Sequence, residues 1–361
     1  MEKTTESASM SAKTEKEGVQ IKGKDIIYLN APEVRLSEDT PLLTDAQDLA
    51  GAINELKKLS EGEGGEGWQP PADWLEVPEP GEWEACFLIE PKQWLSFRLD
   101  FYGSGDKYRS YCGNVTIDWG DGAIETYEGN TQFSGDGWPV WTPESKRRPT
   151  EITHVYAEAG QYIVKATMDE YCCFLGTVQD GKHSGGHVNL LIAKIGENIR
   201  LKADDSDSNF GNGFSENYRL CWVKINGSSD IQNYEFGYCQ GLMRLDLAEP
   251  LVNLPSSAFA SARIPKIDFS YIEKIKGGAL ASATNLPENI TFPECTEIES
   301  YVFSSARIKS ISAPKCTIVG NGAFDNCHAL EYAEFAEDCV FGTNCFQYCY
   351  SLYPRPDGST N

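Results

Sequence analysis

The segment IDWGDG holds two short carboxylates, a pattern that would allow calcium binding or paired acid and base chemistry. These carboxylates are Asp118 and Asp121, and Trp119 lies between them. Aspartates beside glycines are also frequent turn formers, because their side chains accept hydrogen bonds from nearby backbone N–H groups. The sequence favours this second role. We therefore expect turn-forming aspartates and a tryptophan that belongs to the core.

Histidines are the other side chains from which catalysis or metal binding could be built. His183 and His187 share the glycine-rich segment GKHSGGHVN, where two ligands without a third make a poor metal site. We interpret His154, in THVY, as a structural residue of a strand. The sequence has no phosphate-binding glycine loop, nucleophile elbow or HExxH motif. We expect no enzyme, no metal and no cofactor, although carboxylate pairs in an acidic chain leave a glycan-cleaving activity open.

The charge balance excludes two classes of partner. The chain has 54 acidic and 31 basic side chains and a formal net charge of -23, so nucleic acid and anionic membrane surfaces are excluded. No apolar run approaches the roughly 20 residues of a membrane span, and we expect no membrane insertion. Residues 1–23 lack the apolar core of a signal peptide. We expect synthesis in the cytoplasm without export by the general secretory route.

Large apolar residues recur along the C-terminal half at a period of 21 to 23 positions. Each is followed five or six places later by an aliphatic residue, and in most copies a short apolar-polar-apolar run such as Leu245-Asp246-Leu247 comes next. Such a period, with one short strand per unit, predicts a leucine-rich-repeat solenoid, because a single unit cannot bury its apolar face without neighbours. The seven repeat residues are Phe214, Phe236, Phe259, Leu280, Phe303, Phe324 and Phe346.

The repeat also resembles a known class. The stretches ESYVFSSARIKSISAP, GNGAFDNCHALEYAEF and FGTNCFQYCYSLY are similar to units of the bacterial surface-protein type of leucine-rich repeat. The resemblance covers about residues 210–353 and implies a solenoid of parallel strands. It implies no single activity, because repeats of this class occur in adhesins, secreted proteins and virion proteins alike.

The cysteines follow the phase of the repeat. Cys239, Cys327 and Cys349 each lie three residues after a repeat aromatic, and Cys295 and Cys316 each lie eight residues before the next one. Equivalent positions of successive repeats stack as ladders inside a solenoid, where a thiol is a small buried apolar group. We expect buried and mostly reduced thiols, with disulfides or a metal site as the alternatives.

Two rows of residues flank the inward apolar positions of the repeated strand. Strands of successive repeats, called rungs below, lie about 4.8 Å apart in a stacked sheet. The two rows would therefore form one continuous polar face with an aromatic residue near each end. Such a face suits a glycan or a protein partner, and the alternative is a solvated sheet face without a ligand. The candidate ligand-binding residues are Trp222, Lys224, Arg244, Asp246, Lys266, Asp268, Asn289, Thr291, Ser310, Ser312, Tyr332 and Glu334.

A short helix is predicted ahead of the β modules. Its apolar residues recur at spacings of 4, 3, 4 and 3, which is the seam of a coiled coil. About two heptads are marginal for an isolated helix, so it would be stable where several copies meet, as in a homotrimer. The alternative is an amphipathic helix on its own domain, although a Gly/Glu-rich linker at residues 60–67 follows it. The seam residues are Leu42, Ala46, Leu49, Ile53 and Leu56.

Other segments resemble parts of phage proteins. LLTDAQDLAGAINELKKL is similar to a stretch near the start of bacteriophage tail and fibre proteins. GNVTIDWGDG and ITHVYAEAGQYIVKATM resemble the two hallmark segments of the PKD-type β-sandwich, over about residues 84–168. The lead-in WQPPADWLEVPEPGEW is similar to one that precedes the same module in phage virion proteins, and residues 131–148 look like an insertion. The resemblances imply a modular virion protein.

Together these features predict a mainly β chain in four parts. Residues 1–30 are a flexible or partner-ordered arm, 31–67 the oligomerising helix and linker, 68–180 a PKD-like β-sandwich, and 181–361 the solenoid. The expected function is a non-enzymatic structural or adhesive subunit of a phage fibre, tail or head. Its arm would dock on other virion proteins, and its solenoid would face a host glycan or protein. The alternatives are a bacterial cell-surface adhesin and a glycan-cleaving virion appendage.

Overall fold

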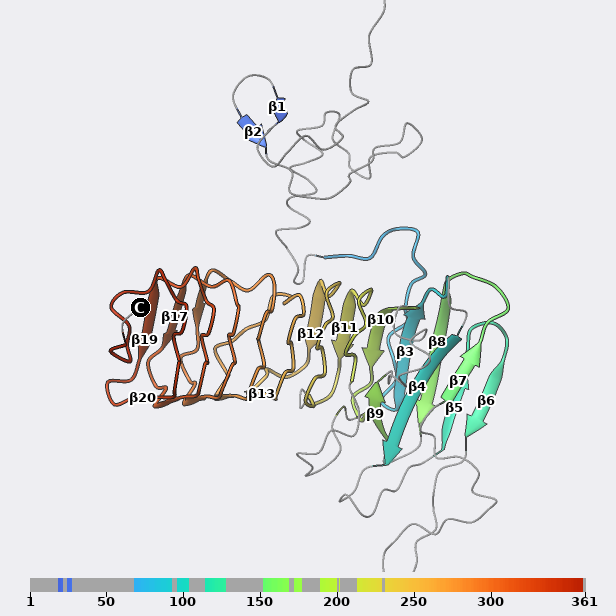
Figure 1. The fold of residues 1–361 in the computed structure, drawn as a ribbon. Helices are drawn as coiled ribbons and strands as arrows, with labels where there is room; N and C mark the ends of the chain where they lie inside the picture. The colour runs from blue at the N-terminus through green and yellow to red at the C-terminus, as the bar shows by residue number, and fades with distance from the viewer. Residues whose placement is uncertain are drawn as a thin grey trace, which may run out of the picture. The chain divides into compact units, whose positions relative to one another are not determined.

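Figure 1 shows a computed structural model of the chain, which forms two compact units, Met1–Glu61 and Gly62–Asn361. The predicted coiled-coil seam, Leu42 to Leu56, and the 131–148 insertion lie outside the residues that the structure describes. The described residues are 19–21, 25–27, 68–92, 96–103, 114–127, 152–168, 172–176, 189–199, 201, 213–228 and 231–359.

The described residues form β-strands and turns, as a mainly β chain requires. In the first unit, β1 (Val19–Ile21) pairs antiparallel with β2 (Asp25–Ile27). Across the described ranges there is no helix of the length and hydropathy that a membrane span needs. The mainly β prediction is confirmed for this part of the chain.

The first module of the second unit contains two sheets of antiparallel strands. β8 lies between β3 and β5, with β6 at the sheet edge, and β4 lies between β7 and β9 in the other sheet. The ring centroids of Phe87 in β3 and Phe97 in β4 are 6.2 Å apart, so the two sheets share an apolar core. The strand bounds are β3 (Glu84–Ile89), β4 (Ser96–Gly103), β5 (Val115–Asp118), β6 (Ile124–Tyr127), β7 (Ile152–Val155), β8 (Tyr162–Met168) and β9 (Cys172–Gly176).

The turn between β5 and β6 carries the two aspartates of IDWGDG. Asp118 Oδ1 accepts a hydrogen bond from the N–H of Gly120 at 3.0 Å, and Asp121 Oδ1 accepts one from Ala123 at 3.0 Å. Gly120 has a φ of +80°, and a Cβ there would lie 2.4 Å from a backbone carbonyl oxygen of β8, so only glycine fits. Trp119 is fully buried. The predicted turn aspartates and core tryptophan are confirmed.

The repeats form a solenoid of parallel strands, as the period predicts. One side carries β11 and β12 and, further along the chain, the three-stranded sheet β15-β17-β19. The other side carries the five-stranded parallel sheet β13-β14-β16-β18-β20. The bounds are β11 (Trp222–Ile225), β12 (Arg244–Leu247), β13 (Asn253–Leu254), β14 (Lys274–Ile275), β15 (Asn289–Thr291), β16 (Glu297–Ile298), β17 (Ser310–Ala313), β18 (Ile318–Val319), β19 (Tyr332–Phe335) and β20 (Val340–Phe341).

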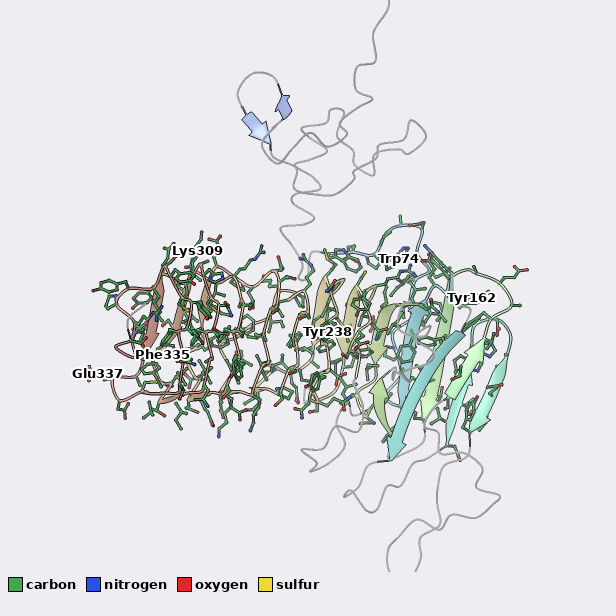
Figure 2. The ribbon with its side chains drawn as sticks, viewed as in Figure 1. Trp74, Tyr162, Tyr238, Lys309, Phe335 and Glu337 are labelled. Atoms are coloured by element: carbon green, nitrogen blue, oxygen red, sulfur yellow. The ribbon has the colours of Figure 1, made fainter. Side chains whose placement is uncertain are left out.

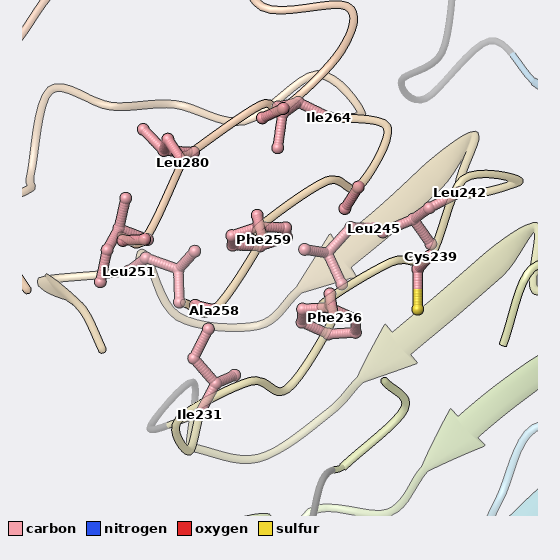
Figure 3. Close-up of a cluster of buried hydrophobic side chains, with 14 of the residues drawn as sticks. Ile231, Phe236, Cys239, Leu242, Leu245, Leu251, Ala258, Phe259, Ile264 and Leu280 are labelled. Atoms are coloured by element: carbon pink, nitrogen blue, oxygen red, sulfur yellow. The ribbon is translucent and has the colours of Figure 1, made fainter. Parts of the chain in front are cut away.

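The repeat residues form a column in the core of the solenoid. Phe303 and Phe324 stack with ring centroids 5.2 Å apart and an interplanar angle of 6°, and Phe236 and Phe259 stack at 5.1 Å and 21°. Figure 3 shows this second pair among the aliphatic residues of its repeats. Each of the seven repeat residues is at most 1% exposed, so the predicted core positions are confirmed.

The sandwich and the solenoid share one sheet. β10 (Leu190–Ile195) pairs antiparallel with β3 and parallel with β11, which gives the seven-stranded order β12-β11-β10-β3-β8-β5-β6. All six residues of β10 are buried, as expected for a strand covered on both faces. The predicted boundary between the two modules lies after residue 180, which places β10 in the solenoid. The seven-stranded sheet continues across this boundary, because β10 pairs with β3 of the sandwich.

Candidate ligand-binding face

The structure divides the two predicted rows into an N-terminal and a C-terminal part. β11 and β12 belong to the seven-stranded sheet, whereas β15, β17 and β19 form a separate sheet. Lys266 and Asp268, from the repeat between these parts, are exposed and lie outside any strand. The expectation of one continuous strand face is therefore wrong.

Proline at position 265 explains this break. Met243, just before β12, donates its N–H to the carbonyl oxygen of Cys221 at 2.8 Å, which continues the backbone ladder from repeat to repeat. Pro265 holds the equivalent position in the third repeat and has no N–H to donate. The run after Pro265 does not extend the sheet, and Asp268 instead accepts a hydrogen bond from the N–H of Ser270 at 2.9 Å. Asp268 is thus a turn residue.

Residues 68–80, called the strap below, are held on the N-terminal part of the face. Arg244 Nη1 donates to the carbonyl oxygen of Trp68 at 3.3 Å. Lys194 Nζ, from β10, donates to the carbonyl oxygen of Val77 at 2.7 Å. The contacts join the strap to strands that lie more than 100 positions away in the chain.

The strap also supplies a carboxylate and apolar packing. Glu79 forms ion pairs with Lys194 at 2.8 Å and with Lys224 at 2.6 Å. Burial opposes ionisation of Glu79, but hydrogen bonds from the two lysines outweigh it and lower the pKa of this carboxyl. Trp74 of the strap and Trp222 pack against the same buried cluster, which includes Val77 of the strap, and Figure 2 shows Trp74 at the sandwich end of the molecule, near β3 and β10. The strap covers this part of the sheet.

The N-terminal candidates also bind one another. Trp222 Nε1 donates to Asp246 Oδ2 at 3.0 Å, and the guanidinium of Arg244 lies 4.3 Å from the centroid of the Trp222 ring. Arg244 Nη2 lies 2.8 Å from Asp246 Oδ2. Together with Lys224, these half-buried residues are occupied by contacts within the chain. Their environment argues for a structural role.

The C-terminal part of the face is open to solvent. Tyr332 is 56% exposed, and the inward residues between the rows, Ile290 and Ile311, are buried. The oxygens of Ser310 and Asn289 lie 2.7 Å apart, and Ser312 Oγ donates to Glu334 at 2.7 Å. The strand register sets these residues in two rows of three. The members of this open face are Asn289, Thr291, Ser310, Ser312, Tyr332 and Glu334.

The open face offers hydrogen bonds and one aromatic surface. Its six side chains contain hydroxyls, an amide, a phenol and a single carboxylate, so the six hold no pair of carboxylates for acid and base work. At its rim Lys309 forms an ion pair with Glu288 at 2.7 Å, which raises the pKa of the lysine (Figure 2). Over the ranges that the structure describes, no cluster of three His, Cys, Asp or Glu residues suits a metal ion.

The predicted structural role of His154 agrees with its contacts. Its ring stacks on Trp119 at 4.8 Å and 12°, and Nε2 lies 2.7 Å from Asp121 Oδ2. Burial opposes ionisation of Asp121, but the interactions with His154 and the backbone hydrogen bond from Ala123 together outweigh it and lower the pKa of the carboxyl. The pair ties β7 to the turn between β5 and β6. The other two candidate histidines, His183 and His187, lie outside the described residues.

One buried carboxyl was not singled out from the sequence. Glu235 is 0% exposed, and the equivalent positions of the next two repeats hold Ala258 and Ala279. Burial raises the pKa of Glu235 to about 8. Its Oε2 accepts a hydrogen bond from the N–H of Gln232 at 3.3 Å, and its Oε1 has no hydrogen-bond partner. An acidic residue at a repeat position that holds alanine in the next two repeats is the sequence signal that could have identified Glu235.

Comparison with known proteins supports the class of the repeats. Residues 211–331 match, in six copies, the family described as BspA type Leucine rich repeat region. A crystal structure of a leucine rich cell surface protein from Faecalibacterium prausnitzii is similar at 17% identity, with a TM-score of 0.25. That match covers 44% of this chain and 62% of the other, so it spans less than two thirds of that protein. No curated protein matches the chain. The family comparison identifies residues 211–331 as a BspA-type leucine-rich-repeat region.

Proposed function

We propose that the chain is a non-enzymatic binding subunit of a bacteriophage virion appendage, and that its open face holds a glycan or protein of the host surface. The virion assignment rests on the resemblance of residues 42–59 to phage tail and fibre proteins and on the PKD-like segments. The binding assignment rests on the open face. Repeats of this class occur in proteins of several functions, so the face carries more weight than the class.

The observation that carries the binding proposal is the contrast between the two parts of the predicted face. Trp222 is engaged by the strap and by Arg244, whereas Tyr332 is 56% exposed beside hydrogen-bonding side chains. A tyrosine can contribute ring contact and a hydroxyl at a modest cost in conformational entropy. Because Glu334 is the only charged member, a neutral or cationic ligand fits the face better than an anionic one.

The rest of the chain would place this face at a distance from the particle. The arm at residues 1–30 would dock on other virion proteins, the seam from Leu42 to Leu56 would form a homotrimer, and the sandwich would act as a spacer. Sedimentation of the full chain tests the trimer, with Ile53→Asp as the variant that should dissociate it. A monomer at high concentration, unchanged by this variant, would contradict the assembly.

Binding is tested on the full-length protein with Tyr332→Ala, against intact host cells and an array of purified envelope glycans. Tyr271→Ala is the matched control, because Tyr271 is 52% exposed and lies outside the face. Loss of the aromatic contact should weaken binding at least about tenfold. The melting temperature should stay unchanged. Equal binding by both variants would contradict the proposal, and shorter glycan products would contradict its non-enzymatic part.

A bacterial cell-surface adhesin is the second candidate, favoured by the match of residues 211–331 to the BspA type of repeat. Antibodies against the chain distinguish the two. Our proposal expects the chain in purified phage particles, at a fixed ratio to the capsid protein. Its detection on the envelope of uninfected bacteria, and not in particles, would favour the adhesin.

A further inference from the structure

Three cysteines lie on successive rungs of the five-stranded side of the solenoid. Cys295 Sγ donates to the carbonyl oxygen of Glu297 at 3.4 Å, and Cys316 Sγ donates to that of Ile318 at 3.2 Å. Glu297 and Ile318 are paired residues of β16 and β18. The two thiols therefore occupy equivalent places one rung apart. Cys339 lies in the next rung, directly before β20, and the register of β18 and β20 offsets it by one residue from the position equivalent to Cys316.

The thiols of this column influence one another. Cys316 interacts with both Cys295 and Cys339, and these interactions contribute to the pKa shifts of all three thiols. Rungs of a parallel sheet are about 4.8 Å apart and successive residues of a strand are about 3.3 Å apart, so Cys316 and a cysteine one residue out of register in the next rung fall within the Cα separation of about 4.4 to 6.8 Å that a disulfide spans. A bond between neighbouring members of the column needs little movement of the backbone.

Access and ionisation differ along the column. Cys295 and Cys316 are 0% exposed, whereas Cys339 is partly exposed and belongs to the outermost rung of the five-stranded sheet. The hydrogen bond from Cys295 lowers the pKa of the Cys316 thiol, while burial raises that of Cys339 to about 12. A reagent thus reaches Cys339 first, and Cys316 is the thiol most ready to act as the second nucleophile.

We propose that Cys316 and Cys339 are a redox-active pair that a low-molecular-weight disulfide, such as oxidised glutathione, converts to a disulfide linking the last two rungs. Cys339 Sγ first attacks one sulfur of the reagent and breaks its S–S bond, and one reagent thiol leaves with the Cys339 proton. Cys316 Sγ then attacks Cys339 Sγ and expels the second reagent thiolate, which takes the Cys316 proton. The protein loses two electrons and two protons, and the reagent becomes two thiols.

The chain supplies two internal controls. Cys327 and Cys349 also stack, since their thiols donate to the carbonyl oxygens of Phe303 at 2.9 Å and Phe324 at 3.0 Å, but both are 0% exposed. Cys221 is partly exposed, and the equivalent position of the next repeat holds no cysteine. Cys327 and Cys349 thus test a stacked pair of thiols that the reagent does not reach. Cys221 tests a thiol that the reagent reaches but that has no cysteine in the next rung.

The test uses the full-length protein, incubated with oxidised glutathione at mildly alkaline pH, alkylated, and mapped by mass spectrometry without reduction. We expect a peptide linked through Cys316 and Cys339 that is about 2 Da lighter than the sum of its parts. Cys221 should carry only glutathione, and Cys327 and Cys349 should stay free. Cys339→Ser should abolish the link, and Cys221→Ser should leave it intact. Glutathione on Cys339 without the link, or an equally fast link between Cys327 and Cys349, would overturn the proposal.

Hydrogen exchange distinguishes a disulfide that stabilises the last rungs of the solenoid from one that has no structural effect. Ends of repeat arrays open more readily than their centres, so a bond between the last rungs should slow exchange at residues 331–353 by at least about tenfold. Reduction should restore the original rate, and Cys339→Ser should show no effect of the oxidant. Unchanged exchange in the linked protein would refute the stabilising role. This outcome is independent of what the open face binds.

Discussion

Equivalent outward positions of the repeat have different surroundings in the N-terminal and C-terminal parts of the solenoid face. On β11 and β12, the outward residues Trp222 and Arg244 contact the strap and one another. On β15, β17 and β19 the outward residues face solvent, with Tyr332 56% exposed. The repeat pattern is the same in both parts, and among the residues that the structure describes, those from outside the repeats cover only the N-terminal part.

This difference separates two kinds of information in a repeat sequence. The period determines which residues point inward, because stacking must bury one continuous core. It does not determine what lies on the outward residues, since Glu79 reaches Lys224 across 145 positions and Trp68 reaches Arg244 across 176. An aromatic residue at an outward position is therefore exposed to solvent in one repeat, as Tyr332 is, and a packing surface in another, as Trp222 is.

The largest expected effect concerns the core column that both parts share. Phe303→Ala removes a ring that is 0% exposed and stacks on Phe324 at 5.2 Å. We expect a loss of roughly 3 to 5 kcal/mol in the free energy of unfolding, as for other large truncations in a core. Urea unfolding measures it. A loss below about 1 kcal/mol would mean that the column is not the core of the solenoid.

The comparison itself is sharpened by two alanine variants at equivalent outward positions. Trp222→Ala should cost about 2 to 3 kcal/mol, because the packing against the apolar cluster around Val77 and the hydrogen bond to Asp246 are lost. Tyr332→Ala should change stability by less than about 0.5 kcal/mol. Urea unfolding of both variants is the measurement. Equal losses in the free energy of unfolding for the two variants would contradict the distinction between the covered and the open part of the face.

The buried carboxyl of the N-terminal repeats gives a pH-dependent prediction. The pKa of Glu235 is about 8 in the folded chain against 4.5 for an ordinary glutamate, so ionisation of the unfolded state penalises folding as pH rises from about 4.5 to 8. Glu235→Gln keeps the volume and removes the charge. We expect it to exceed the wild type in stability by roughly 1 to 3 kcal/mol at pH 7. The two proteins should converge near pH 4, and a constant difference across this range would contradict the assignment.

The smallest expected effect comes from the strap carboxylate. The pKa of Glu79 is lowered in the folded chain, so its ion pairs add stability above about pH 4.5 and lose it as the pH falls below this value. The side chain is 58% exposed, which limits the contribution to less than about 1 kcal/mol. Tryptophan fluorescence during an acid titration should show a step that Glu79→Gln lacks. An identical titration for both proteins would argue against these ion pairs.

Much of the fold was predictable because the sequence repeats. The seven core positions, the parallel strands and the buried ladder cysteines all follow from equivalent positions meeting in a stack. The turn aspartates Asp118 and Asp121 were predictable from neighbouring glycines alone. Pro265 is visible in the sequence as well, but its effect on the strand ladder depends on the N–H that Met243 contributes in the repeat before it.

The covered part of the face was not predictable from the repeats. Lys194 lies in the apolar run LLIAKI and is only 5% exposed, and the strap partners that satisfy it, Val77 and Glu79, are more than 100 residues away. No local pattern links such segments. The sequence therefore predicts a ligand contact for Trp222, Lys224 and Arg244, whereas in the structure these side chains pack against or bind the strap.

The most direct test of the two-part face is side-chain footprinting of the full-length protein with hydroxyl radicals. Indole rings are ordinarily the more reactive, so solvent access must decide the order in which Trp222 and Tyr332 are oxidised. We predict that Tyr332 is oxidised faster than Trp222 and that bound host glycan or protein protects Tyr332 alone. Oxidation of Trp222 at the rate of an exposed tryptophan, or its protection by the ligand, would contradict the account.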